Sequence, residues 1–123
     1  MSGGALYLAE AQAPLRAELD TRPGLLLLEF GTGWCGHCRA AQPAITSWLT
    51  GQIGIDHLRI EDGPGRALGR SFRVRMWPTL ILLRDGRELA RVVRPLVPAD
   101  LAGVLDPALA GAAGIAPAGS GEL

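Results

Sequence analysis

The chain contains two cysteines, Cys35 and Cys38, within the run Trp34-Cys35-Gly36-His37-Cys38. The run is predicted to follow a buried strand and to form the first turn of a helix. Residues three apart on a helix have β-carbons about 5–6 Å apart, which lets the two sulfurs form a reversible disulfide. The N–H groups and the positive dipole end of the helix stabilise a thiolate beside them. We therefore predict that Cys35 is the nucleophile, with a lowered pKa, and that Cys38, one turn deeper, keeps a higher pKa and resolves the mixed disulfide.

Gly36 and His37 lie between the two cysteines and are predicted to tune their redox balance. An imidazolium near the thiolate favours the reduced, charged form of the pair. The pair is therefore expected to be comparatively oxidising.

Zinc and haem are the other ligands that a closely spaced cysteine pair suggests. A structural zinc site needs four ligands, whereas the chain has two cysteines and two histidines and no second closely spaced pair. Covalent haem attachment requires a histidine directly after the second cysteine, and that position is Arg39. Metal binding by the cysteine pair is a weak alternative, and the expected redox group is the Cys35–Cys38 disulfide itself, with no cofactor.

Glu29 is the charged residue of an otherwise apolar run, six positions before Cys35. It is either a buried acid and base for Cys38 or a solvent-facing residue at a sheet edge. His57, on or beside a later strand, is more often a satisfied polar residue than a ligand, and we give it only a supporting role.

The composition indicates one globular domain over residues 1–110, followed by an Ala-, Gly- and Pro-rich tail, residues 111–123, that is expected to be disordered. Twelve basic residues, all arginine, balance twelve acidic ones, so no charge excess draws the chain to nucleic acid or to a membrane surface. The first residues do not resemble a signal peptide, and no run of suitable length and character spans a bilayer. A cytoplasmic monomer is expected.

Strands and helices alternate along the chain and end in a hairpin. The hydrophobic pattern predicts strands at 25–30, 53–60, 79–83 and 88–93, and helices at 14–21, 39–49 with a kink at Pro43, 65–72, and from 98 to 105 or 109. Asp62-Gly63-Pro64-Gly65 is predicted to be a turn, and Asp85-Gly86 the hairpin turn. This order predicts an α/β fold whose sheet is mixed, parallel in its first half, with helices on both faces.

These motifs together resemble the thioredoxin superfamily over about residues 8–110. Glu29-Phe30, the cysteine run, Pro43, Trp77-Pro78-Thr79 before an apolar strand and Asp85-Gly86 occur in that family's order and at near-family spacing. The Gly-His pair between the cysteines is similar to that of protein disulfide isomerase domains. The resemblance implies a thioredoxin fold with a mixed central sheet of four or five strands.

The resemblance also implies roles for residues outside the cysteine run. Pro78 would be the family's cis-proline, and Trp77, Pro78 and Thr79 would form the substrate groove with Trp34. Glu29 would take the place of a buried aspartate that serves the resolving cysteine, which favours the buried reading of this residue.

The resemblance further places His57 near the position at which the family carries the residue that pairs with that buried acid. Arg94-Pro95 replaces the family's glycine near the end of the last strand, and both this change and the bulk of Trp77 would reshape the groove.

The sequence therefore predicts a thiol–disulfide oxidoreductase that acts on protein thiols and disulfides and is recycled by a reductase or thiol donor. The direction of exchange stays open, because a reducing compartment favours a reductase and the Gly-His pair favours an oxidant or isomerase. The alternative is a non-catalytic binding, chaperone or redox-sensing module of the same fold.

Overall fold

The computed structural model of the chain describes residues 7–115. A short 3-10 helix η1 (Glu10–Gln12) and helix α1 (Arg16–Asp20) precede strand β1 (Leu25–Gly31). Helix α2 (Gly36–Thr50), strand β2 (Ile55–Glu61) and helix α3 (Ala67–Ser71) follow. Strands β3 (Thr79–Arg84) and β4 (Arg87–Val93) and helix α4 (Pro98–Ile115) are the last of the described elements.

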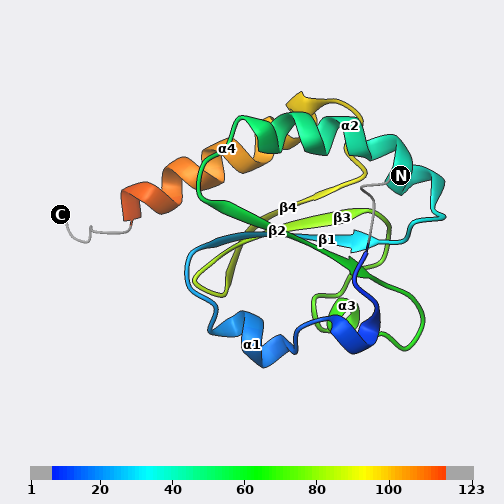
Figure 1. The fold of residues 1–123 in the computed structure, drawn as a ribbon. Coiled ribbons are helices and arrows are strands. Elements are labelled where there is room, and N and C mark those ends of the chain that lie inside the picture. The colour runs from blue at the N-terminus through cyan, green and yellow to red at the C-terminus, as the bar shows by residue number, and fades with distance from the viewer. Residues whose placement is uncertain (1–6, 116–123) are drawn as a thin grey trace.

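The strands form one mixed sheet in the order β2-β1-β3-β4. Strand β1 is parallel to β2 and antiparallel to β3, and β3 and β4 form the antiparallel hairpin. Helices α2 and α4 cover one face of the sheet and α1 and α3 lie on the other (Figure 1). This confirms the thioredoxin fold and the mixed sheet predicted from the sequence, with four strands.

Two layers of apolar side chains hold the helices to the sheet, because side chains of a strand point alternately to its two faces. Leu27 packs with Ile45 and Leu101 on the face of α2 and α4. Leu28 and Phe30 pack with residues of the α1 and α3 face. Strand β1 is buried on both faces from residue 26 onward, as its continuous apolar run predicts.

Several element boundaries differ from those predicted. The first helix is shorter than 14–21, and α2 begins at Gly36, directly after the first cysteine, rather than at 39. Pro43 lies inside this helix, as predicted. Helix α4 extends to Ile115, through residues 111–115 that the sequence analysis placed in the tail. Alanine is the strongest helix former, so an Ala-rich segment continues a helix with little to bury. The remainder of the predicted tail, residues 116–123, lies outside the described residues.

The residues described between 7 and 115 include no helix that is both long and apolar enough to cross a membrane.

Candidate active site

The two cysteines lie where β1 passes into α2. Cys35 is the N-cap of α2, with extended backbone, and its Sγ accepts a hydrogen bond from the backbone N–H of Cys38 at 3.3 Å. An N-cap acceptor satisfies one of the free N–H groups at the start of a helix, and negative charge is stabilised there. Both thiols are free. The predicted placement is confirmed, with Cys35 at the cap rather than inside the first turn.

Cys35 keeps 8% of its surface exposed. Burial by itself would raise its pKa, but this effect is outweighed by hydrogen bonds from the Cys38 thiol and from the backbone N–H groups of Cys38 and His37, together with the positive charge of Arg94. The net result is a lowered pKa for Cys35, in the direction predicted. His37 lowers the pKa of Cys35 through its backbone N–H, and the redox effect of its imidazolium stays a prediction.

Cys38 is 1% exposed. Burial, followed by the hydrogen bond and the negative charge of Cys35, raises its pKa to about 12, against smaller lowering effects of a backbone hydrogen bond from Thr32 and a hydrogen bond from Tyr7. The pKa of Cys35 is therefore lowered and that of Cys38 raised, in the directions expected from the sequence, while their roles as nucleophile and resolving thiol stay predictions.

Glu29 is fully buried, which decides between the two interpretations of this residue in favour of the interior. Its Oε2 accepts hydrogen bonds from Tyr7 Oη at 2.6 Å and Gln42 Nε2 at 2.8 Å. Its Oε1 contacts His57 Nε2 at 2.9 Å and accepts from Arg59 Nε at 3.2 Å. The pairing of Glu29 with His57 that the family resemblance suggested is therefore present.

These contacts fix the charge of Glu29. Burial alone would raise the pKa of its carboxyl, but hydrogen bonds from His57, Tyr7 and Gln42 and the charge of Arg59 lower it to about 2. Glu29 is thus a carboxylate throughout the neutral range. Two residues connect Glu29 to Cys38. Gln42 Nε2 donates to Glu29 and to the Cys38 carbonyl at 2.9 Å, and the Tyr7 hydroxyl donates to Glu29 and lowers the pKa of the Cys38 thiol.

Trp34, which directly precedes Cys35, contacts the loop that holds the other predicted groove residues. The Trp77-Pro78 peptide bond is cis, as predicted. Trp34 is 71% exposed and meets Trp77 edge to face, with ring centroids 5.8 Å apart. The indole N–H of Trp77 donates to Asp62 Oδ2 at 2.9 Å. Thr79 is buried at the start of β3 and donates its hydroxyl to the Met76 carbonyl.

Arg94 follows β4 and contacts the Trp77-Pro78-Thr79 loop, near the position at which the family resemblance expects a glycine. Its backbone has φ 53°, in the left-handed region that favours glycine. Its N–H donates to the Pro78 carbonyl at 3.0 Å and its Nε to the Trp77 carbonyl at 2.8 Å. The side chain is therefore anchored to the cis-proline loop, close enough to Cys35 for its charge to act on the thiolate.

The sequence analysis missed four residues of this site: Tyr7, Gln42, Asp62 and Arg59. Asp62 was assigned to a turn, although its carboxylate is buried and holds Trp77. Tyr7 is the single tyrosine of the chain, which is the one signal in the sequence that could have drawn attention to it. Its position at the site follows from Leu8, the next residue, which pairs with β2.

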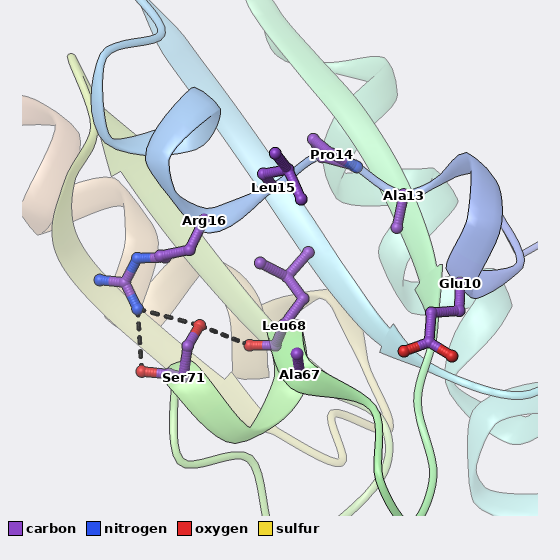
Figure 2. A pocket seen from close by; sticks show the side chains of 8 residues that line it. All are labelled: Glu10, Ala13, Pro14, Leu15, Arg16, Ala67, Leu68 and Ser71. Atoms are coloured by element: carbon purple, nitrogen blue, oxygen red, sulfur yellow. Dashed lines mark hydrogen bonds between the residues drawn. The ribbon is translucent and has the colours of Figure 1, made fainter.

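A pocket of about 250 Å³ lies away from the cysteines, between the segment that leads into α1 and helix α3. Figure 2 shows Leu15, Arg16 and Leu68 at its lining, with Arg16 hydrogen-bonded to Ser71. The lining includes none of the predicted site residues. Within residues 7–115, no group of three or more His, Cys, Asp and Glu side chains is placed to hold a metal ion.

Comparison with known proteins agrees with this geometry. Thioredoxin 2 from Pseudomonas aeruginosa, in its reduced form, is 50% identical and superposes with a TM-score of 0.76 over 88% of this chain and 98% of that one. The thioredoxin of Chlamydia caviae is 38% identical over 73 residues, 57% of this chain and 69% of that protein. Protein disulfide-isomerase A3 of Gallus gallus is 34% identical over 90 residues, 72% of this chain and 18% of that protein.

The matches differ in how much of each relative they include. The chain spans 57% of Thioredoxin H2 of Arabidopsis thaliana, with 29% identity over 76 residues. The family model described as Thioredoxin matches residues 8–106, which include every predicted site residue. This match confirms the family that the motifs of the sequence indicated. The chain belongs to the thioredoxin family.

Proposed function

We propose that this chain is a thioredoxin-type oxidoreductase that exchanges its Cys35–Cys38 dithiol for disulfides of protein substrates. The observation that carries the proposal is the opposite shift of two neighbouring thiols, since the pKa of Cys35 is lowered and that of Cys38 is raised to about 12. A thiolate is the attacking species in disulfide exchange, so only one of the two sulfurs is ready to start the reaction.

The exchange takes place in two steps. The Cys35 thiolate attacks a substrate disulfide, a Cys35–substrate bond forms, and one substrate sulfur leaves as a thiolate. Cys38 then gives up its proton and attacks Cys35 Sγ, so the Cys35–Cys38 disulfide forms and the second substrate sulfur leaves with its electron pair. The substrate is reduced by two electrons and the chain is oxidised by two, and a reductase or thiol donor returns it to the dithiol.

The exposed Trp34 and the Trp77-Pro78-Thr79 loop are proposed to bind the substrate segment next to its disulfide. Side chains of an extended peptide can contact the two indoles beside the cis-proline, since Trp34 is largely exposed. Glu29 is proposed to act on Cys38 indirectly, through the hydroxyl that lies between them, and Glu29→Ala is expected to slow resolution of the mixed disulfide.

The proposal is tested by reduction of insulin with dithiothreitol, comparing the wild type with Cys35→Ser and Cys38→Ser. Both variants are expected to lose the acceleration, and Cys38→Ser alone is expected to accumulate a mixed disulfide with insulin. Equal rates for all three proteins would overturn the proposal and favour the non-catalytic binding module.

The Gly36-His37 pair supports a more oxidising potential than a Gly-Pro pair, as in isomerase-type domains. Equilibration of the wild type and His37→Pro with glutathione buffers measures this directly. The variant is expected to be more reducing by about 30 mV or more, a tenfold change in the equilibrium constant for a two-electron couple. Equal potentials would remove His37 from the tuning of the pair.

A further inference from the structure

The hydroxyl of Tyr7 lies at the junction of the cysteine pair and the Glu29 network. Tyr7 is fixed by its neighbour, because Leu8 N–H donates to the Arg59 carbonyl at 2.8 Å and the Leu8 carbonyl accepts from Glu61 N–H at 2.9 Å. The segment before η1 thus runs parallel to β2 at Leu8 and places Tyr7 beside Gly31, the last residue of β1.

Gly31 makes room for this contact. A methyl group placed on its Cα would lie 2.6 Å from Cys38 Sγ and 3.2 Å from Tyr7 Oη, so both atoms are within reach of one point above the glycine. The hydroxyl also donates to Glu29 Oε2 at 2.6 Å. Tyr7 therefore stands between a buried carboxylate and a buried thiol.

Glu29 does not depend on the Tyr7 proton alone. Gln42, His57 and Arg59 also contact its two oxygens. When the Tyr7 O–H turns away, the carboxylate keeps these partners. The donors that act on a Cys38 thiolate are the backbone N–H of Thr32 and the Tyr7 hydroxyl.

We propose that Tyr7 is a catalytic residue in the second step of exchange, in which its O–H points to Glu29 while Cys38 is a thiol and turns to Cys38 Sγ as the thiolate forms. This inference rests on the proposed function. Cys38 gives up one proton to water, its thiolate displaces the substrate sulfur from Cys35, and that sulfur takes up a proton from water. The phenol keeps its proton throughout.

The surroundings support a hydroxyl that donates without ionising. Burial, with the charge and hydrogen bond of Glu29, raises the pKa of Tyr7 far above its ordinary value. The charged and titratable groups that face the ring are Glu29, Cys38 and Arg59, whose guanidinium lies 5.3 Å from the ring centroid. A neutral phenol can therefore serve Glu29 and Cys38 in turn at any working pH.

The test separates the two steps with the aromatic disulfide dithiobis(nitrobenzoate), which releases one coloured thiolate when Cys35 attacks and a second when Cys38 closes the disulfide. In Tyr7→Phe the first release is expected to stay within about twofold of the wild type. The second is expected to slow by about tenfold or more, the effect of losing one hydrogen bond to a charged group. Its pH midpoint should move upward, because the Cys38 thiolate has lost a donor.

Two comparisons separate this role from a structural one. Tyr7 is the single tyrosine, so growth on 3-fluorotyrosine modifies one site with a more acidic, stronger donor, and the pH midpoint of the second release should move downward. Trp48→Phe removes the hydrogen bond to Asp106 at 2.9 Å between α2 and α4, ten residues beyond Cys38 and outside the Glu29 network, and it should leave this midpoint in place.

The outcomes distinguish this inference from the proposed function. An unchanged second release in Tyr7→Phe, in both rate and pH midpoint, overturns the role of Tyr7 while leaving the exchange reaction intact. The absence of any second release from the wild type overturns the proposed function itself.

Discussion

Glu29 should make the unfolding free energy of this domain depend strongly on pH in the acid range. The pKa of its carboxyl falls from an ordinary 4.5 to about 2 in the folded chain, although burial alone would raise it, because of hydrogen bonds from His57, Tyr7 and Gln42 and the charge of Arg59. One pKa unit corresponds to about 1.4 kcal/mol, so the folded state gains about 3 kcal/mol from ionised Glu29.

The sign of the effect follows from the direction of the shift. A carboxyl whose pKa is lower in the folded state than in the unfolded state contributes its full stabilisation above the unfolded value. The contribution is lost as the pH falls from about 4.5 to about 2. Below that range both states are protonated at this position, and the carboxyl no longer favours folding.

Glu29→Gln is the perturbation that isolates this contribution. The amide keeps the shape of the side chain but presents an N–H₂ group to partners that are themselves donors. We expect the variant to lose about 3 kcal/mol of unfolding free energy at pH 7, with the difference from the wild type shrinking toward zero near pH 2. Urea unfolding of the reduced proteins at several pH values between these limits measures it.

Glu61→Gln is a matched control on the neighbouring strand β2. Its side chain is 35% exposed and pairs with Arg66 at 3.3 Å, and such a pair contributes about 1 kcal/mol or less. A difference between wild type and Glu29→Gln that stays constant from pH 7 to acid would refute the reasoning, since a loss of packing alone carries no pH dependence.

Two substitutions near the cysteines give further predictions. Arg94→Gly relieves a φ of 53° and should raise the free energy of unfolding in urea by up to about 1 kcal/mol. The variant also removes a positive charge, so thiolate absorbance should show a higher pKa for Cys35. An unchanged pKa would contradict the role of this charge. Gly31→Ala brings a methyl group within 2.6 Å of Cys38 Sγ and should cost about 1–3 kcal/mol and slow the second thiolate release. Gly33→Ala meets nothing within 4 Å and should change neither quantity, so equal behaviour of the two alanine variants would argue against the crowding.

The strands could be predicted from the sequence because their signals are local. Leu25–Gly31 and Thr79–Arg84 were found to within one residue, since a short apolar run bounded by turn residues fits a strand buried on both faces. The end of the last helix could not be predicted in this way. Residues 111–115 were placed in the tail because of their Ala- and Gly-rich composition, although alanine favours a helix even where few apolar contacts support it.

The cysteine pair was also a local signal, whereas the groups around it come from distant parts of the chain. Tyr7 hydrogen-bonds to Glu29, 22 positions away, and no periodicity relates the two. Asp62 was predicted to belong to a turn, because it begins an Asp-Gly-Pro-Gly run. Its buried carboxylate accepts the indole N–H of Trp77, a contact that this local pattern does not indicate. The residues that act on the sulfurs were predictable where they share a strand, helix or loop with them, and hidden where only the fold brings them together.

The order of the two steps follows from how the backbone donors are divided between the sulfurs. Burial raises the pKa of both thiols, but Cys35 receives two backbone N–H groups, those of His37 and Cys38, whereas Cys38 receives one, that of Thr32. The hydrogen bond and the charge of Cys35 are also among the causes that keep Cys38 protonated. Once Cys35 is bound in a mixed disulfide, its negative charge is gone and this part of the barrier to ionising Cys38 goes with it. The first step thus prepares the second sulfur for attack without any movement of the fold.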